Sequence, residues 1–341
     1  MIMNRRHFMG SAAAFMAALP CQARSGANGR RALARVIIDN DFAGDPDGLF
    51  QLAHHLLSPS VRIPMIISSH LPPRFGGPAS AAEGMAKAKE LLAVMKAAGA
   101  AKLFAGSESS IPSRRSWKPG PATAAIVHEA MRADRDDPLV YAAGAGLTEL
   151  ALAWLAEPRI GRRLKLVWIG GGEHAGTGYP PPGPDETEFN VSIDPIAAQI
   201  VFNESDIDIW QVPRDAYRQM LFTSAEMQDL ATSGPLGRFL QGQLDGMASK
   251  LAKIPGFSAM PATEVHILGD SPLVTLTALL TPVQPDPSSS RYILKPTPHL
   301  LADGRYRENP NGRPMRVYTS IDASLTIRDM VSKFRARREI P

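Results

Sequence analysis

The segment ARVIIDNDFAGDPDGLFQLAHHLLS, residues 34–58, decides the fold class of this 341-residue chain. Its first residues form an apolar run typical of a buried strand, and the apolar positions from Leu49 to Leu57 recur with helical spacing. Between the two lie four carboxylates within nine positions: Asp39, Asp41, Asp45 and Asp47. A strand that leads through a polar loop into a helix predicts one unit of an α/β fold.

The same alternation of strand and helix patterns continues along the chain. Strand patterns lie at 61–69, 101–106, 138–144, 164–171 and 206–213, and helix patterns lie at 80–99, 122–132, 147–156 and 194–203. Further helix patterns follow near 224–252, 271–280 and 322–337, among short strands. Continuously apolar strands that are each followed by a helix predict an open, mostly parallel sheet flanked by helices. No linker divides the pattern, so residues 34–341 are predicted to form a single domain.

The composition supports a globular protein and gives little support to nucleic-acid binding. Hydrophobic residues make up 44% of the chain and charged residues 21%, which is enough apolar material for a core. We find no run of Lys and Arg with interleaved aromatic residues, so a nucleic-acid partner is not expected. The oligomeric state stays open, and a homo-oligomer is compatible with the sequence.

The N-terminal stretch MNRRHFMGSAAAFMAALPCQA has the layout of a twin-arginine signal peptide. Arg5 and Arg6 precede a short apolar stretch that ends in small residues at Ala23, and the stretch is too short for a membrane span. We therefore expect a signal peptide at 1–23, a linker at 24–33, a periplasmic or secreted protein, and no membrane contact after cleavage. Cleavage would remove Cys21, the one cysteine of the chain, and would leave neither a disulfide nor a cysteine metal site.

The carboxylates behind the first strand call for a positive charge. Asp39 and Asp41 follow directly on an apolar run, and buried carboxylates need a counter-charge or a cation. Asp47 can also be explained as the cap of the following helix. An all-oxygen ligand set favours Ca²⁺ or Mg²⁺.

Unusual polar residues also follow other strands of the predicted sheet. SSH follows the second strand at 68–70, GAG follows at 144–146, and GGGEH follows at 170–174. In open α/β sheets ligands bind at the carboxyl ends of the strands. One crevice is therefore predicted to collect these segments together with the carboxylates.

A phosphatase of the haloacid dehalogenase type is one interpretation of the acidic stretch. Asp39 would be its nucleophile and Asp41 its acid/base residue, with Mg²⁺ as the cofactor, and Gly-Asp-Ser at 269–271 would supply a later motif. Against this interpretation, Ala43 stands where that family has Thr or Val. Val274 also stands where a second metal-binding Asp is expected.

Several motifs in order resemble the inosine-uridine-preferring nucleoside hydrolase family. They are GAGLTELALAWLAEP at 144–158, WIGGGEHAG at 168–176, EFNVSIDPIAAQIVFN at 188–203 and GDSPLVTLTAL at 269–279. Together with the acidic stretch they span about residues 35 to 330 in the order of the family. The resemblance implies that family's Rossmann-like fold and a Ca²⁺-dependent hydrolysis of an N-glycosidic bond to ribose, with Mg²⁺ as the less favoured ion.

The resemblance also implies roles for the residues of the metal site. Asp41 would be a metal ligand and the base that takes a proton from the attacking water, and Asp39 would be a ligand or would orient one. Asp270 would be the distant ligand, and Gly144 would offer its backbone carbonyl. The adjacent Asp pair of the family is interrupted here by Pro46, so Asp45 and Asp47 compete for the last metal position, as the sequence shows.

Other positions would bind a small ribosyl substrate. Glu188 and Asn190 would hydrogen-bond the sugar hydroxyls, and His70 and Thr177 stand where the family has asparagines that contact the sugar. Gly269 replaces a histidine that some members use to protonate the leaving base, so this role has no obvious owner. His174, which follows the triple glycine, is the catalytic candidate for it, and a packed loop histidine is the alternative interpretation. His54 and His55 lie within the helix pattern and are interpreted as packing or surface residues. A periplasmic nucleoside or sugar binder that has lost turnover is the non-enzymatic alternative.

Overall fold

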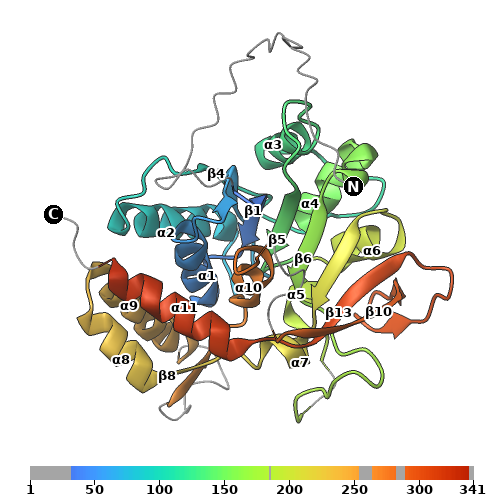
Figure 1. Cartoon of the computed structure of the whole chain (residues 1–341). Coiled ribbons are helices and arrows are strands. Elements are labelled where there is room, and N and C mark those ends of the chain that lie inside the picture. Colours follow the sequence, from blue (N-terminus) through green and yellow to red (C-terminus); the bar gives the residue numbers. More distant parts are fainter. Residues whose placement is uncertain (1–31, 184–185, 253–262, 282–288, 338–341) are drawn as a thin grey trace, which may run out of the picture. The chain divides into compact units, whose positions relative to one another are not determined.

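The alternating patterns fold into one central sheet with helices on both of its faces (Figure 1). The structure is a computed structural model, and it describes residues 32–183, 186–252, 263–281 and 289–337. Residues Ala32–Pro341 form one compact unit, which confirms the single domain expected from the sequence. The expected signal peptide at 1–23 and the linker as far as residue 31 lie outside the described residues.

The elements keep the order that the sequence predicts. The strands are β1 Ala34–Asn40, β2 Val61–Arg62, β3 Met65–Ser68, β4 Lys102–Ala105, β5 Leu139–Ala143, β6 Lys165–Ile169, β7 Asp208–Val212, β8 Leu221–Thr223, β9 Val265–Ile267, β10 Arg291–Pro296, β11 His299–Leu300, β12 Tyr306–Arg307 and β13 Pro314–Ser320. The helices are α1 Asp47–Leu56, α2 Ser80–Val94, α3 Pro121–Ala130, α4 Thr148–Ala156, the 3₁₀ helix η1 Pro158–Arg162, α5 Phe189–Ile193, α6 Pro195–Asn203, α7 Arg214–Tyr217, α8 Ser224–Thr232, α9 Pro235–Leu251, α10 Pro272–Thr277 and α11 Ala323–Ala336.

The central sheet is mostly parallel, as expected. Its order is β10-β13-β7-β6-β5-β1-β3-β4, with β2 beside the start of β1. All of its pairings are parallel except that of β10 with β13. The strand expected at 61–69 divides into β2 and β3, and Pro64, which lies between them, has no N–H to contribute to a ladder.

The two faces of the sheet carry separate apolar cores, and β1 contributes to both. Val36 and Ile38 pack on the face that α1, α10 and α11 cover, whereas Ile37 packs on the face of α3, α4 and α6. These side chains are fully buried, and each such burial stabilises a fold by about 1.5–3 kcal/mol. Because side chains alternate along a strand, Asp39 continues the face of Ile37 and Asn40 continues the face of Ile38.

Within the described residues no helix is both long and apolar enough to cross a membrane.

Candidate functional site at the carboxyl ends of the strands

The carboxyl ends of β1, β3 and β5 bring three of the predicted segments together. Asn40 pairs with Ser68 at the end of β3, and the Ser69 amide donates to the Asn40 carbonyl at 2.9 Å. On the other side of β1, the Gly144 amide donates to the Asp39 carbonyl at 2.9 Å. Parallel pairing therefore places the acidic stretch between the SSH and GAG segments, as expected for a crevice at this edge of the sheet.

Asp39 lies fully buried and is held by two hydroxyl groups. The Ser69 hydroxyl donates to Oδ1 and the Tyr141 hydroxyl donates to Oδ2, both at 2.6 Å. Burial raises the pKa of Asp39 to about 7, and these two hydrogen bonds oppose the rise. Both carboxylate oxygens are engaged and shielded from solvent, which suits an orienting residue and disfavours Asp39 as a phosphatase nucleophile.

Asp41, Asp47 and Asp270 form an acidic group beside Asp39. Burial raises the pKa of Asp41 well above its usual value, and the charge of Asp270 is the next cause. Burial and the same Asp270 charge also raise the pKa of Asp47. Lys87 on α2 is a cationic side chain whose charge acts on this group, and its ammonium donates to the Ala43 carbonyl at 3.4 Å.

The structure separates the two carboxylates that compete for one role. Asp47 is half-buried, and its Oδ2 accepts a hydrogen bond from the Asp270 amide at 3.2 Å. Asp45 is exposed, and its Oδ1 accepts from the Asp47 amide at 3.4 Å. Asp47 is therefore the member of the pair that joins Asp270 directly.

Asp270 approaches the end of β5 because Gly144 has no side chain. A Cβ atom at this position would lie 2.7 Å from Asp270 Oδ1 and 2.4 Å from the Nδ2 atom of Asn40. The carbonyl of Gly144 accepts a hydrogen bond from Asn190 Nδ2 at 3.1 Å, and the same nitrogen donates to the Ile169 carbonyl at 2.7 Å. Asn190 thus ties the ends of β5 and β6 together next to the acidic group.

The acidic group offers oxygen atoms alone as possible metal ligands. Across the described residues no set of three or more His, Cys, Asp or Glu side chains is close enough together to hold a metal ion.

Glu188 is buried and lies next to the acidic group. Its Oε2 accepts hydrogen bonds from the amides of Gly171 at 2.7 Å and Val191 at 3.1 Å, and its Oε1 accepts from the Tyr217 hydroxyl at 2.9 Å. Burial raises the pKa of Glu188 while these hydrogen bonds oppose the rise, and its charge acts on Asp270. The role of Tyr217 as a partner of Glu188 emerges only from the fold.

His70 and His174 lie in different surroundings. His70 is buried behind β3, and burial lowers its pKa, while the backbone of Ile193 and Ser107 and the charge of Asp194 oppose the fall. His174 is bound on both sides, by Gln211 Oε1 at 2.8 Å and by the Lys295 ammonium at 3.1 Å, and its ring stacks on Tyr306 with centroids 4.2 Å apart. Burial lowers the pKa of His174 to about 4, so its ring is neutral and engaged. The expectation that it protonates the leaving group gains no support from this geometry.

Thr177 turns toward its own loop. Its hydroxyl donates to the His174 carbonyl at 2.9 Å. The sugar contact expected from its position in the motif stays a prediction.

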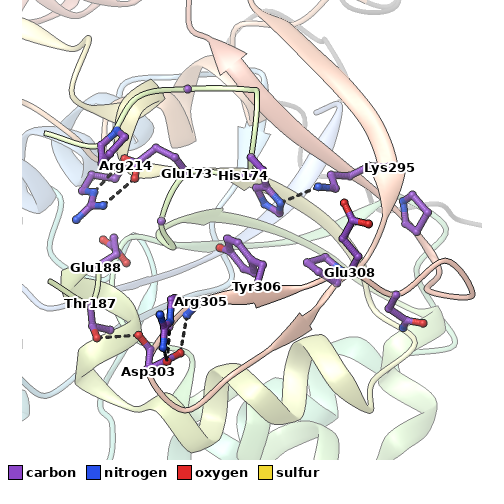
Figure 2. Close-up of a pocket in the computed structure, with 18 of the residues that line it drawn as sticks. Glu173, His174, Thr187, Glu188, Arg214, Lys295, Asp303, Arg305, Tyr306 and Glu308 are labelled. Carbon is purple, nitrogen blue, oxygen red and sulfur yellow. Dashed lines mark hydrogen bonds and ion pairs between the residues drawn. The ribbon is translucent and has the colours of Figure 1, made fainter. Parts of the chain in front are cut away.

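A cavity of about 900 Å³ opens beyond Glu188 (Figure 2). Its wall includes His174 and Glu188 but none of the carboxylates of the 39–47 stretch. Arg214 forms two hydrogen bonds to Glu173 across this wall, and His174 points toward Lys295. Arg214, Lys295 and Tyr306 of this wall lie in no motif of the sequence and come from distant segments that only the fold brings together.

The chain is similar in sequence to nucleoside hydrolases. A sequence model of the family described as inosine-uridine preferring nucleoside hydrolase matches residues 36–279. The inosine-uridine preferring nucleoside hydrolase of Leishmania major is 48% identical over 81 residues. That stretch is 24% of this chain and 24% of the relative, so the match spans about a quarter of the relative's length.

Solved structures share the fold over nearly the whole described domain. A plant nucleoside hydrolase superposes with a TM-score of 0.66 at 18% identity and covers 89% of this chain and 99% of its own. The purine-preferring ribonucleoside hydrolase from Gardnerella vaginalis gives a TM-score of 0.64 at 19% identity, with 90% and 100% covered. At such identities the likeness concerns the fold. The match of the family sequence model over most of the chain shows more: this protein belongs to the inosine-uridine preferring nucleoside hydrolase family, a family of hydrolases that act on N-glycosyl compounds.

Proposed function

We propose that this chain hydrolyses the N-glycosidic bond between ribose and the base of a nucleoside or a related ribosyl compound. The observation that carries the proposal is the acidic group of Asp41, Asp47 and Asp270 at the carboxyl end of β1, within a chain of this family. The phosphatase alternative has less support, since both oxygens of Asp39 are engaged by hydroxyl groups.

We propose Ca²⁺ as the cofactor, held by Asp41, Asp47, Asp270 and the Gly144 carbonyl. The donor set consists of oxygen atoms alone, and the missing side chain of Gly144 lets Asp270 come close to the strand end. These residues fit a hard cation. Irregular carboxylate sets suit Ca²⁺ better than Mg²⁺, which demands near-ideal octahedral geometry. When bound, the ion would supply positive charge that balances the carboxylates and acidifies a neighbouring water.

The chain's own carboxylates account for the attack on the sugar. Asp41 accepts the proton of the water whose oxygen attacks the anomeric carbon, while the bond from this carbon to the base nitrogen breaks. Its pKa, raised by burial and by the charge of Asp270, makes it a better proton acceptor than an ordinary aspartate. The surrounding carboxylates stabilise the positive charge that develops on the sugar in an oxocarbenium-like transition state.

The substrate residues are proposed from their place around this centre. Glu188 and Asn190 lie next to Asp270 and Gly144, respectively, and we assign them to the sugar hydroxyls. His70 follows the end of β3, where Ser69 pairs with Asn40, and we assign it a further substrate contact, while Thr177 shapes the loop beside the cavity. His174 belongs to the cavity wall rather than to proton transfer, so the protonation of the leaving base has no assigned residue.

Export through a twin-arginine signal to the periplasm or the medium remains part of the proposal. It rests on the paired arginines and apolar stretch of residues 1–23. Detection of a mature protein that begins near residue 24 in the periplasmic fraction would support it, and an unprocessed chain in the cytoplasm would contradict it.

The decisive experiment measures the release of reducing sugar from a panel of nucleosides with added Ca²⁺. We expect sugar release by the wild-type protein and a loss of about 10²- to 10⁴-fold in Asp41→Asn, because the general base is removed. Undiminished activity of Asp41→Asn contradicts the assigned base. Release of phosphate from p-nitrophenyl phosphate with Mg²⁺, without sugar release, favours the phosphatase, and nucleoside binding without turnover favours the binder.

A further inference from the structure

A network of buried polar side chains, called here the polar network, runs from the acidic group into the apolar core between α1 and α10. Asn40 Nδ2 donates to Asp270 Oδ2 at 2.8 Å and to Gln51 Oε1 at 3.4 Å. Gln51 Nε2 is bonded to His55 Nδ1, and His55 Nε2 to the Thr277 hydroxyl at 2.8 Å. Buried polar groups in a core are costly unless each finds a partner, so a fully hydrogen-bonded network of this kind needs a reason beyond packing.

Every hydrogen bond in this polar network has a defined direction. The Thr277 hydroxyl donates to the Leu273 carbonyl at 2.6 Å, so its oxygen must accept from His55 Nε2. In a neutral ring Nδ1 of His55 is then an acceptor, and Gln51 must present its NH₂ group to it and its oxygen to Asn40. Burial lowers the pKa of His55 to about 3, which keeps the ring neutral and the direction unchanged at physiological pH.

At its end the polar network contacts two parts of the acidic group. The NH₂ group of Asn40 holds the Asp270 carboxylate, and its Oδ1 accepts from the Asp41 amide at 2.8 Å. The Asn40 side chain is also confined by two glycines, since a Cβ atom on Gly48 would lie 2.8 Å from Asn40 Cγ and one on Gly144 would lie 2.4 Å from Asn40 Nδ2. A shift of Asn40 would therefore displace both carboxylate-bearing residues.

The polar network also joins the separate elements that carry the acidic group. Asn40 ends β1, Gln51 and His55 lie on α1, and Thr277 ends α10, whose first turn follows Asp270. α1 and α10 contact each other in the core, and both lie near β1 in Figure 1. The hydrogen bonds thus close a loop through the three elements and return to the residue they position.

We propose that Gln51 and His55 are positioning residues, which act through Asn40 to fix Asp270 and the backbone at Asp41 in the arrangement that receives the cation. This inference rests on the proposed function and gives His55 a role that its place in an apolar helix pattern does not indicate. Partners behind metal ligands commonly change metal affinity by about 10- to 100-fold when they are removed.

The test compares Gln51→Met and His55→Met with His54→Gln in the full chain. His54 is a matched control, because it is equally buried on α1 but is bonded to Asp329 on α11 at 2.6 Å and so lies outside the polar network. Two properties are measured: the dissociation constant for Ca²⁺ by calorimetry, and the hydrogen exchange of residues 39–47 by mass spectrometry without added cation.

We expect about tenfold weaker Ca²⁺ binding and faster exchange of residues 39–47 in both Met variants, and neither change in His54→Gln. Both residues act through the same polar network, so the loss of Ca²⁺ affinity in the double variant should equal that of the weaker-binding single variant. Independent residues would instead give the product of the two losses. Equal affinities and exchange rates in all variants would overturn the inference, as would multiplying losses. If the wild-type protein binds no Ca²⁺, the proposed cofactor fails, and the exchange measurement alone decides the positioning role.

Discussion

Replacing Asp270 by Asn should stabilise the cation-free protein at alkaline pH while it weakens cation binding. Burial, together with the charges of Asp45 and Glu188, raises the pKa of Asp270 from 3.8 to about 7. The folded state therefore binds a proton more tightly than the unfolded state, so the stability of the wild-type protein falls as the pH rises from about 4 to about 7 and stays low above that.

The size of the effect follows from this shift. At about 1.36 kcal/mol per pKa unit, ionised Asp270 costs at most about 4 kcal/mol of folding free energy. An Asn side chain has the same shape, can still accept from Asn40 and carries no charge. With an unfolding entropy of about 2.1 cal/mol/K per residue, a domain of about 310 residues shifts its Tm by about 1.5 °C for each kcal/mol. We therefore expect Asp270→Asn to melt about 5 °C above the wild-type protein at pH 8 in a chelator.

The assay is thermal unfolding between pH 4 and pH 8, with chelator and with added Ca²⁺. The difference between the two proteins should vanish near pH 4, and Ca²⁺ should raise the Tm of the wild-type protein more than that of the variant. Asp245→Asn on the exposed side of α9 is the control and should show neither effect. A variant that is no more stable than the wild-type protein at pH 8, or equally stabilised at pH 4 and pH 8, would refute the reasoning.

Two further outcomes follow from close contacts in the site. Gly144→Ala places a methyl group 2.4 Å from the Asn40 side-chain nitrogen and should cost about 1–3 kcal/mol in urea unfolding, whereas Gly242→Ala, whose methyl group meets nothing within 4 Å, should not destabilise; equal effects would contradict the crowding. Tyr217→Phe removes the hydroxyl that donates to Glu188 at 2.9 Å and holds its pKa down, so the acid limb of the pH profile of kcat/KM should move to higher pH. An unchanged profile would show that Glu188 need not ionise.

The sequence predicted the fold class and the local motifs because both depend on neighbouring residues. Apolar runs that alternate with helical spacing indicated β1, α1 and the strands and helices as far as β7, and these are observed in the same order. The acidic stretch could be recognised at the end of β1 because polar residues followed directly on a buried strand. Pro64 is a local exception, since the pattern of 61–69 did not show that the strand would divide there.

The interpretation of individual histidines was less complete. His55 lies on the same apolar helix pattern as its neighbours, so its bonds to Gln51 and Thr277 could not be inferred from spacing. His174 follows a glycine-rich motif, but its ring is taken up by Gln211 and Lys295. In each case the partner that decides the role comes from another part of the chain.

By itself the sequence determined the strand and helix order, the oxygen-rich chemistry behind β1 and the motifs of the family. The tertiary structure alone decided that Asn40 meets Asp270 across 230 positions of sequence, and that Asp47 rather than Asp45 contacts Asp270. The physical reason is that strand and helix patterns reflect local burial, whereas the site depends on which strand ends lie side by side. That neighbourhood is set by the packing of β1, β5, α1 and α10, and no local pattern encodes it.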